Sequence, residues 1–186
     1  MMGPAYLTGE RLSLRAPVTT DAEVAAAWFP SVFPVGAGRA ESYLKDKLKS
    51  AWWPDREFHL MIVRIADDQV VGSLIVEHPT GPGAIVTIKL TPALSPSELD
   101  ETQADTLRIL IPWLLDEAEA LTVTVGIGAD EPRSLDAAHD LGMETAIRLR
   151  EFLARPGGRV DLIQAQALHP RRAAMVPSVT PSSGGD

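Results

Sequence analysis

The adjacent residues Glu77 and His78 are the strongest candidates for proton transfer in this sequence. A carboxylate beside an imidazole can accept and return a proton near neutral pH. The pair follows Val70–Val76, an apolar run that predicts a strand. Neighbouring strand residues point to opposite faces of a sheet, so only one of the two can face a given cleft. We therefore take Glu77 and His78 as the candidate catalytic residues.

The remaining polar residues form no familiar metal or nucleophile pattern. The sequence has no cysteine, and its four histidines, His59, His78, His139 and His169, include no pair at metal-ligand spacing. It also contains no Walker loop, no Rossmann glycine fingerprint and no Ser-His-Asp order. We expect no metal site, and we expect His139 to lie on a polar helix face.

Three tryptophans, Trp28, Trp52 and Trp53, are candidates for lining a substrate pocket. Aromatic side chains often form the walls of such pockets. Packing in the core is the competing interpretation for any of them.

Length and composition predict one globular domain. The chain has 186 residues, of which 45% are hydrophobic and 23% charged, and its formal net charge is −8. An acidic chain without a broad basic patch is a poor ligand for nucleic acid. The start of the sequence has no signal-peptide pattern, and the apolar stretch Ile109–Leu115 is too short to cross a membrane. We expect a cytoplasmic protein with a folded domain over 1–169 and a disordered tail over 170–186.

Periodicity predicts an α/β chain with a regular order of elements. A short strand at Leu12–Arg15 precedes a helix starting at Thr20 or Asp21 and a second helix over Arg39–Trp53. Three strands that pair as hairpins follow, over 58–66, 70–76 and 84–90. A long helix carries an apolar stripe formed by Leu107, Leu110, Ile111, Leu114, Leu115 and Ala118. A strand over 121–125, a helix over 132–141 capped by Gly142, and strands over 146–154 and 160–168 complete the order. Because Val160–Leu168 is placed near a sheet edge, it is a candidate pairing surface, and we expect a monomer or a two-fold dimer.

Four local sequences in this order resemble the GNAT superfamily of N-acetyltransferases, in particular its ribosomal-protein acetyltransferase branch. They are Gly9–Arg15 followed by Thr20–Glu23, then Val71–Leu74, then Ser134 with Leu141–Met143, and finally Arg150–Phe152 with Gly158–Asp161. The resemblance covers about residues 9–169. It implies a mixed, mainly antiparallel central sheet flanked by helices, and acyl transfer from acetyl-CoA or another acyl-CoA to an amine of a small molecule or peptide.

The resemblance also implies a donor site near the start of the long helix, with contacts at Leu90, Ser95 and Ser97. In the family, a loop of arginine and glycines offers backbone N–H groups to the pyrophosphate of acetyl-CoA. The matching arginine position here is Ser95, and the glycine positions are Pro96 and Glu98. Ser95 to Glu98 instead predicts a capping box, which consumes N–H groups and adds negative charge. An acidic site for a cation or an amine is the alternative interpretation of this segment.

Two further family positions differ. The glutamate that acts as general base in some members corresponds to Ile85, and the tyrosine that protonates the leaving thiolate corresponds to Ala138. Two hypotheses therefore stand side by side. One is an acyl-CoA-dependent N-acyltransferase, and the other is a CoA-independent homologue that binds a ligand or partner or performs different chemistry.

Overall fold

The structure is a computed structural model that describes residues 5–29, 35–50, 57–78 and 82–170. Trp52, Trp53 and residues 171–186 lie outside these ranges, and what was predicted for them remains a prediction. In chain order the elements are β1 (Ala5–Thr8), β2 (Leu12–Arg15), a 3-10 helix η1 (Thr19–Val24), α1 (Ala25–Trp28), α2 (Ala37–Ser50), β3 (Glu57–Arg64), β4 (Gln69–Glu77), β5 (Ala84–Leu90), α3 (Pro96–Asp116), β6 (Thr122–Gly128), α4 (Pro132–Asp140), β7 (Glu144–Arg155) and β8 (Gly158–Leu168).

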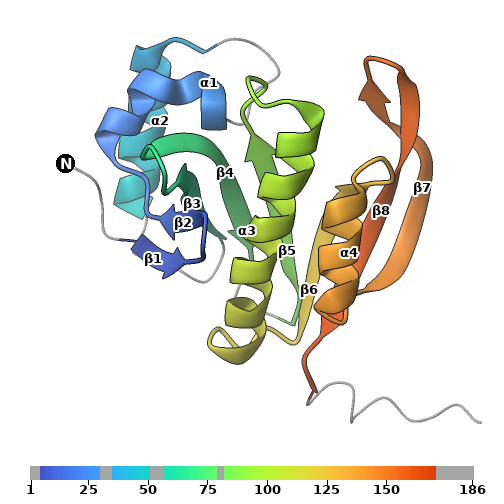
Figure 1. Cartoon of the computed structure of the whole chain (residues 1–186). Helices are drawn as coiled ribbons and strands as arrows, with labels where there is room; N and C mark the ends of the chain where they lie inside the picture. The colour runs from blue at the N-terminus through green and yellow to red at the C-terminus, as the bar shows by residue number, and fades with distance from the viewer. Residues whose placement is uncertain (1–4, 30–34, 51–56, 79–81, 171–186) are drawn as a thin grey trace, which may run out of the picture.

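The strands form a sheet of eight strands in the order β1-β2-β3-β4-β5-β6-β8-β7 (Figure 1). Every neighbouring pair is antiparallel except β5 and β6, which run parallel because α3 carries the chain back between them. The expected mixed, mainly antiparallel sheet is confirmed.

Helices cover both faces of the sheet. Of the stripe predicted for the long helix, Leu107, Leu110, Ile111 and Leu114 are buried, while Leu115 and Ala118 are partly buried. Helix α3 packs with α4 on the face that holds Leu60, Ile62 and Leu74. Figure 1 shows α3 and α4 side by side on this face, which we call the α3 face. The alternating residues Met61 and Val63 point the other way and pack against α1 and α2. We call that side the α1 face.

One predicted pairing surface and one predicted helix start needed correction. The strand Val160–Leu168 lies near an edge as expected, but it offers no free pairing surface, because β8 pairs with both β6 and the edge strand β7. The helix expected from Thr20 or Asp21 begins as η1, and neither residue caps it, since Val18 is the N-cap. Asp21 is instead buried, where its carboxylate accepts hydrogen bonds from Arg15 at 2.7 and 2.9 Å and from the Val18 N–H at 2.8 Å.

Candidate functional site

The parallel strands β5 and β6 separate after a very short ladder. Only three residue pairs join them, Ala84↔Val123, Ile85↔Thr124 and Val86↔Val125. Both strands continue beyond this point, β5 to Leu90 and β6 to Gly128, each paired only with its other neighbour. A gap therefore opens in the centre of the sheet on the side where α3 begins.

The backbone of β5 points into this gap the polar groups that no described strand pairs with. The Thr91 N–H donates to the Val71 carbonyl at 2.8 Å, which makes the opposed residues Gly72 and Leu90 a non-hydrogen-bonded pair of β4 and β5. The N–H and C=O groups of Leu90, and by alternation those of Ile88, consequently face β6, which pairs with neither residue. A ligand with amide groups can complete the ladder there.

Gly72 allows β5 to take this position. A β-carbon at residue 72 would lie 2.3 Å from the Lys89 carbonyl oxygen and 2.8 Å from Cδ2 of Leu90. Any side chain at this position must therefore displace the strand that forms one wall of the gap.

A row of side chains crosses the α1 face at the closed end of the gap. The cross-strand register places its members side by side on six strands, in the order Glu57, Glu77, Ile85, Thr124, Gln166 and Glu144. Glu77 is exposed and lies directly beside Ile85, whose side chain is 48% exposed. Directly opposed side chains have β-carbons about 5 Å apart. The sheet thus brings the candidate carboxylate of Glu77 to the residue next to the gap.

His78 and Trp28 are placed differently from Glu77. His78 follows the end of β4, is exposed, and has a positive φ of 52°. Trp28 is 0% exposed, and its indole N–H donates to the Asp21 carbonyl at 2.7 Å. Its ring packs near the rings of Phe29 and His59, with centroid distances of 5.5 and 5.8 Å. Trp28 is therefore a core residue, and its indole presents no open wall for a substrate.

The start of α3 has the predicted capping box. The Glu98 carboxylate accepts from the Ser95 N–H at 2.8 Å and from the Ser95 hydroxyl at 2.7 Å, while the Glu98 N–H donates to Ser95 Oγ at 3.3 Å. These hydrogen bonds lower the pKa of Glu98 below its ordinary value of 4.5. Pro96 has no N–H, and the Leu99 N–H donates to the Ser95 carbonyl. The remaining donor of this turn is the Ser97 N–H, which has no acceptor among the described residues.

A buried carboxylate fixes α4 to α3 beside the gap. Asp100 accepts from the backbone N–H groups of Arg133 and Ser134 at 2.9 and 2.8 Å, and from the Ser134 hydroxyl at 2.8 Å. One turn further along α3, Gln103 donates to Glu131 at 3.0 Å. Asp100 thus caps the first turn of α4 from another helix.

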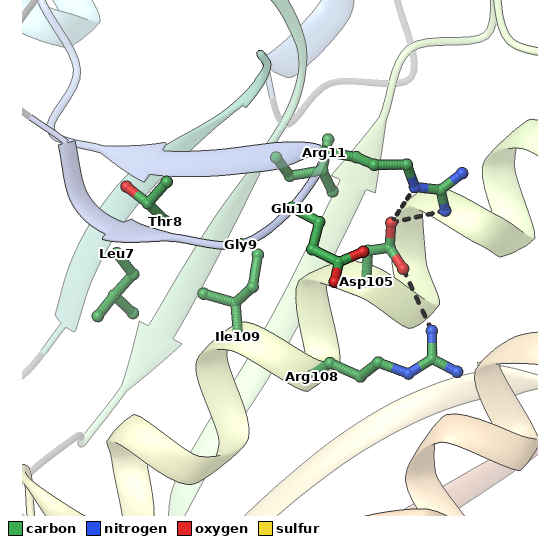
Figure 2. A pocket seen from close by; sticks show the side chains of 9 residues that line it. Leu7, Thr8, Gly9, Glu10, Arg11, Asp105, Arg108 and Ile109 are labelled. Atoms are coloured by element: carbon green, nitrogen blue, oxygen red, sulfur yellow. Dashed lines mark hydrogen bonds and ion pairs between the residues drawn. The ribbon is translucent and has the colours of Figure 1, made fainter. Parts of the chain in front are cut away.

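A separate cavity of about 640 Å³ lies between the β1–β2 turn and α3 (Figure 2). Figure 2 shows Arg11 and Arg108 on either side of Asp105, and both arginines pair with its carboxylate, at 2.6 and 3.2 Å. Arg11 also pairs with Glu101 at 2.9 Å. The cavity contains none of the residues predicted from the sequence to form a site, and its facing charges already neutralise one another.

Comparison with solved structures identifies the fold. The chain is 46% identical to a protein from Sphaerobacter thermophilus DSM 20745 that carries an inferred acetyltransferase assignment, with a TM-score of 0.71 over 91% of this chain and 99% of that one. This chain belongs to the GNAT superfamily of acetyltransferases. More distant GNAT structures share the fold alone. They include ribosomal-protein-S5-alanine acetyltransferase from Vibrio fischeri (14% identity, TM-score 0.61, 88% of this chain and 96% of that one) and spermidine/spermine N-acetyltransferase SpeG from Vibrio cholerae (13%, 0.60, 89% and 97%). No family model and no curated protein matches the chain.

The two family positions that differ have contrasting places in this GNAT protein. Ile85 lies in the row at the closed end of the gap, whereas Ala138 of α4 is buried in the core of the α3 face. Leu90, Ser95 and Ser97 all lie along the chain that leaves the gap and enters α3. Sequence reasoning thus named positions around the gap without predicting the gap itself.

Sequence reasoning missed Lys89, the one charged residue in β5. Its partner in the register is Ser73, whose hydroxyl donates to the Trp28 carbonyl at 2.9 Å, so Lys89 points to the α1 face near α1. The side chain is half-buried, and this burial lowers the pKa of its ammonium group. A single lysine within the alternating segment Ala84–Leu90 was the signal that could have drawn attention to it.

Two negative observations apply to the part of the chain that the structure describes. Among these residues, no group of three or more His, Cys, Asp or Glu side chains is arranged to hold a metal ion. No described helix has the length and apolar character needed to cross a membrane.

Proposed function

We propose that this GNAT protein transfers an acyl group from a CoA thioester to an amine. The observation that carries the proposal is the gap between β5 and β6, with the polar backbone groups of Ile88 and Leu90 directed into it. The pantetheine arm of CoA is an extended chain with two amide groups, and such a chain can pair with a strand edge.

The donor would be held along one wall of the gap and at the start of α3. Leu90 offers its backbone groups, and Ser97 offers the N–H of the first helical turn for which the described residues supply no acceptor. The Ser95 hydroxyl becomes available only if the Glu98 carboxylate moves away, since the two are now hydrogen-bonded at 2.7 Å. The chemistry that the donor supplies is an activated acyl carbon on a thiol leaving group.

The acceptor amine would approach from the α1 face. Glu77 lies beside the closed end of the gap, and its carboxylate can take a proton from an incoming ammonium group, directly or through water. His78 would serve only as a second group that passes the proton on, because it lies beyond the end of β4. Acceptors of the kinds that solved relatives are named for, a polyamine or a peptide amine, are the first to test.

The capping box favours a second candidate, a GNAT protein that binds a ligand or partner without CoA. The Glu98 carboxylate already accepts the hydrogen bonds that a phosphate would take at Ser95, and it would repel the pyrophosphate of CoA. On this alternative the gap serves a ligand without phosphate groups.

Calorimetric titration separates the two candidates. Acetyl-CoA and S-acetyl-pantetheine, which has no nucleotide, are titrated into the wild-type protein and into a variant with Ser95→Arg, Pro96→Gly and Glu98→Gly. We expect both donors to bind the wild type. The variant should bind acetyl-CoA more tightly than the wild type does, and its affinity for S-acetyl-pantetheine should be unchanged. Saturable thiol release in the presence of a polyamine or a peptide would then establish transfer. Binding of neither donor to either protein would contradict the acyltransferase proposal.

A further inference from the structure

Lys89 is isolated from the other lysines of this protein. The sequence contains four lysines, and the other three, Lys45, Lys47 and Lys49, all belong to α2. Lys45 is exposed and pairs with Glu41 at 2.6 Å. Lys89 lies in the central sheet, within the part of β5 that has separated from β6.

The position of Lys89 brings an amine to the wall of the gap. Residues Thr87 to Leu90 form that wall, and Lys89 is three residues from Val86, where the gap closes. Three strand residues span about 10 Å. Because a lysine side chain has four flexible methylene groups, its amine can reach back along the α1 face toward the middle of this wall.

Burial makes the neutral amine of Lys89 more accessible than that of a fully exposed lysine. Its side chain is half-buried beside Ser73, under the segment that contains Trp28. Burial lowers the pKa of the ammonium group, and a neutral amine is the form that attacks a carbonyl carbon. Lysines that act as nucleophiles are commonly activated in this way.

We propose that Lys89 is a self-acylation site, whose amine accepts the acyl group of a thioester bound in the gap between β5 and β6. This inference rests on the proposed function, because the thioester is the donor of that reaction. The nitrogen lone pair of Lys89 forms a bond to the acyl carbon, and the carbon–sulfur bond breaks. Sulfur leaves with the bonding pair and takes up the proton that the nitrogen loses, so the products are an acyl-lysine and a free thiol.

Self-acylation would also change the acceptor side of the site. The product has no charge at residue 89 and is bulkier than lysine, so it fills space on the α1 face beside Ile85 and Thr87. An acylated protein should therefore bind amine acceptors more weakly.

Mass spectrometry of the intact folded protein tests the proposal. The protein is incubated with acetyl-CoA and, separately, with S-acetyl-N-acetylcysteamine, a short thioester without a nucleotide. Peptide mapping then gives the initial rate of acetylation at each of the four lysines. We expect Lys89 to react about tenfold or more faster than Lys45, because binding holds the donor beside it. The rate per molecule should not change with protein concentration.

Matched variants assign the labelled site. Lys89→Arg keeps the positive charge and should lose the rapid label, whereas Lys45→Arg should keep it. Protein unfolded in urea should label its lysines at similar rates. Thermal melting of Lys89→Arg verifies that the variant is folded, and Lys89→Met provides a second variant in case the arginine is not accommodated.

The outcomes distinguish this inference from the proposed function. If the short thioester labels Lys89 rapidly and calorimetry detects no binding of acetyl-CoA, self-acylation is supported and the use of CoA is contradicted. Calorimetric binding of acetyl-CoA with Lys89 labelled no faster than Lys45 by either donor would overturn self-acylation and leave the acyltransferase proposal intact. Slow labelling of Lys89 with no binding of either donor would overturn both.

Discussion

Among the described glycines, Gly72 leaves the least room for a side chain. A β-carbon there would approach the Lys89 carbonyl oxygen to 2.3 Å, and a backbone atom cannot swing aside as a side chain can. We expect Gly72→Ala to lower the free energy of unfolding by about 1–3 kcal/mol, the usual cost of overpacking. It should also weaken donor binding, because β5 carries the free edge of the gap. Chemical denaturation and calorimetry measure the two effects.

Gly38 provides the matched control for that substitution. It lies in α2, and a β-carbon there would meet no atom within 4 Å. Gly38→Ala should therefore stabilise the protein by about 0.5–1 kcal/mol through helix propensity. Equal effects of the two substitutions would contradict the close approach of β4 and β5.

Glu98 gives the capping box a dependence on pH. The hydrogen bonds from Ser95 lower the pKa of Glu98 in the folded protein below its ordinary value of 4.5. A lowered folded-state pKa means that the stabilisation is present above about pH 4.5 and is lost as the pH falls through the folded value. Wild type should melt at a higher temperature than Glu98→Gln at pH 7, and the difference should shrink toward pH 3. A difference that stays constant over this range would show that the charge of Glu98 does not contribute.

At the scale of elements, the attachment of α4 to α3 depends on Asp100. Its buried carboxylate accepts three hydrogen bonds from the first turn of α4, so removing it leaves those donors without a partner. We expect Asp100→Ala to lower the free energy of unfolding by about 2–3 kcal/mol. Asp136→Ala, at an exposed position of the same helix, should change it by less than about 0.5 kcal/mol. Urea denaturation compares them, and a cost below 1 kcal/mol for Asp100→Ala would contradict the cap.

The elements that sequence predicted well are those specified by local patterns. Ala84–Leu90 alternates and is β5, and Ser95 caps α3 because the capping box lies within four consecutive residues. β1 was missed because four residues of mixed polarity carry little periodic signal. The separation of β5 from β6 could not be predicted, since register depends on contacts between residues distant in sequence. The complete burial of Trp28 could not be predicted for the same reason, because the burial of an aromatic residue depends on tertiary packing.

At the scale of the whole molecule, the sheet consists of two parts joined by a short ladder. Strands β1 to β5 form one part and β6, β8 and β7 the other, and three residue pairs connect them. Native-state hydrogen exchange should therefore show different opening free energies for the β3–β4 and β6–β8 ladders. A donor in the gap should selectively protect the amides of Ile88 and Leu90. Uniform protection across all eight strands would contradict the division.

The gap also determines how the protein should unfold when a donor is bound. A donor arm that pairs with the free edge of β5 takes the place of the ladder that ends at Val86 and links both parts of the sheet through one molecule. Such a ligand strengthens the coupling between the parts, whereas a ligand bound to one part would stabilise that part alone. The thermal transition should therefore become sharper as well as shift upward, with the van't Hoff enthalpy approaching the calorimetric enthalpy. In this sense an acyl donor would act as a transient ninth strand, and the cooperativity of melting would report its presence.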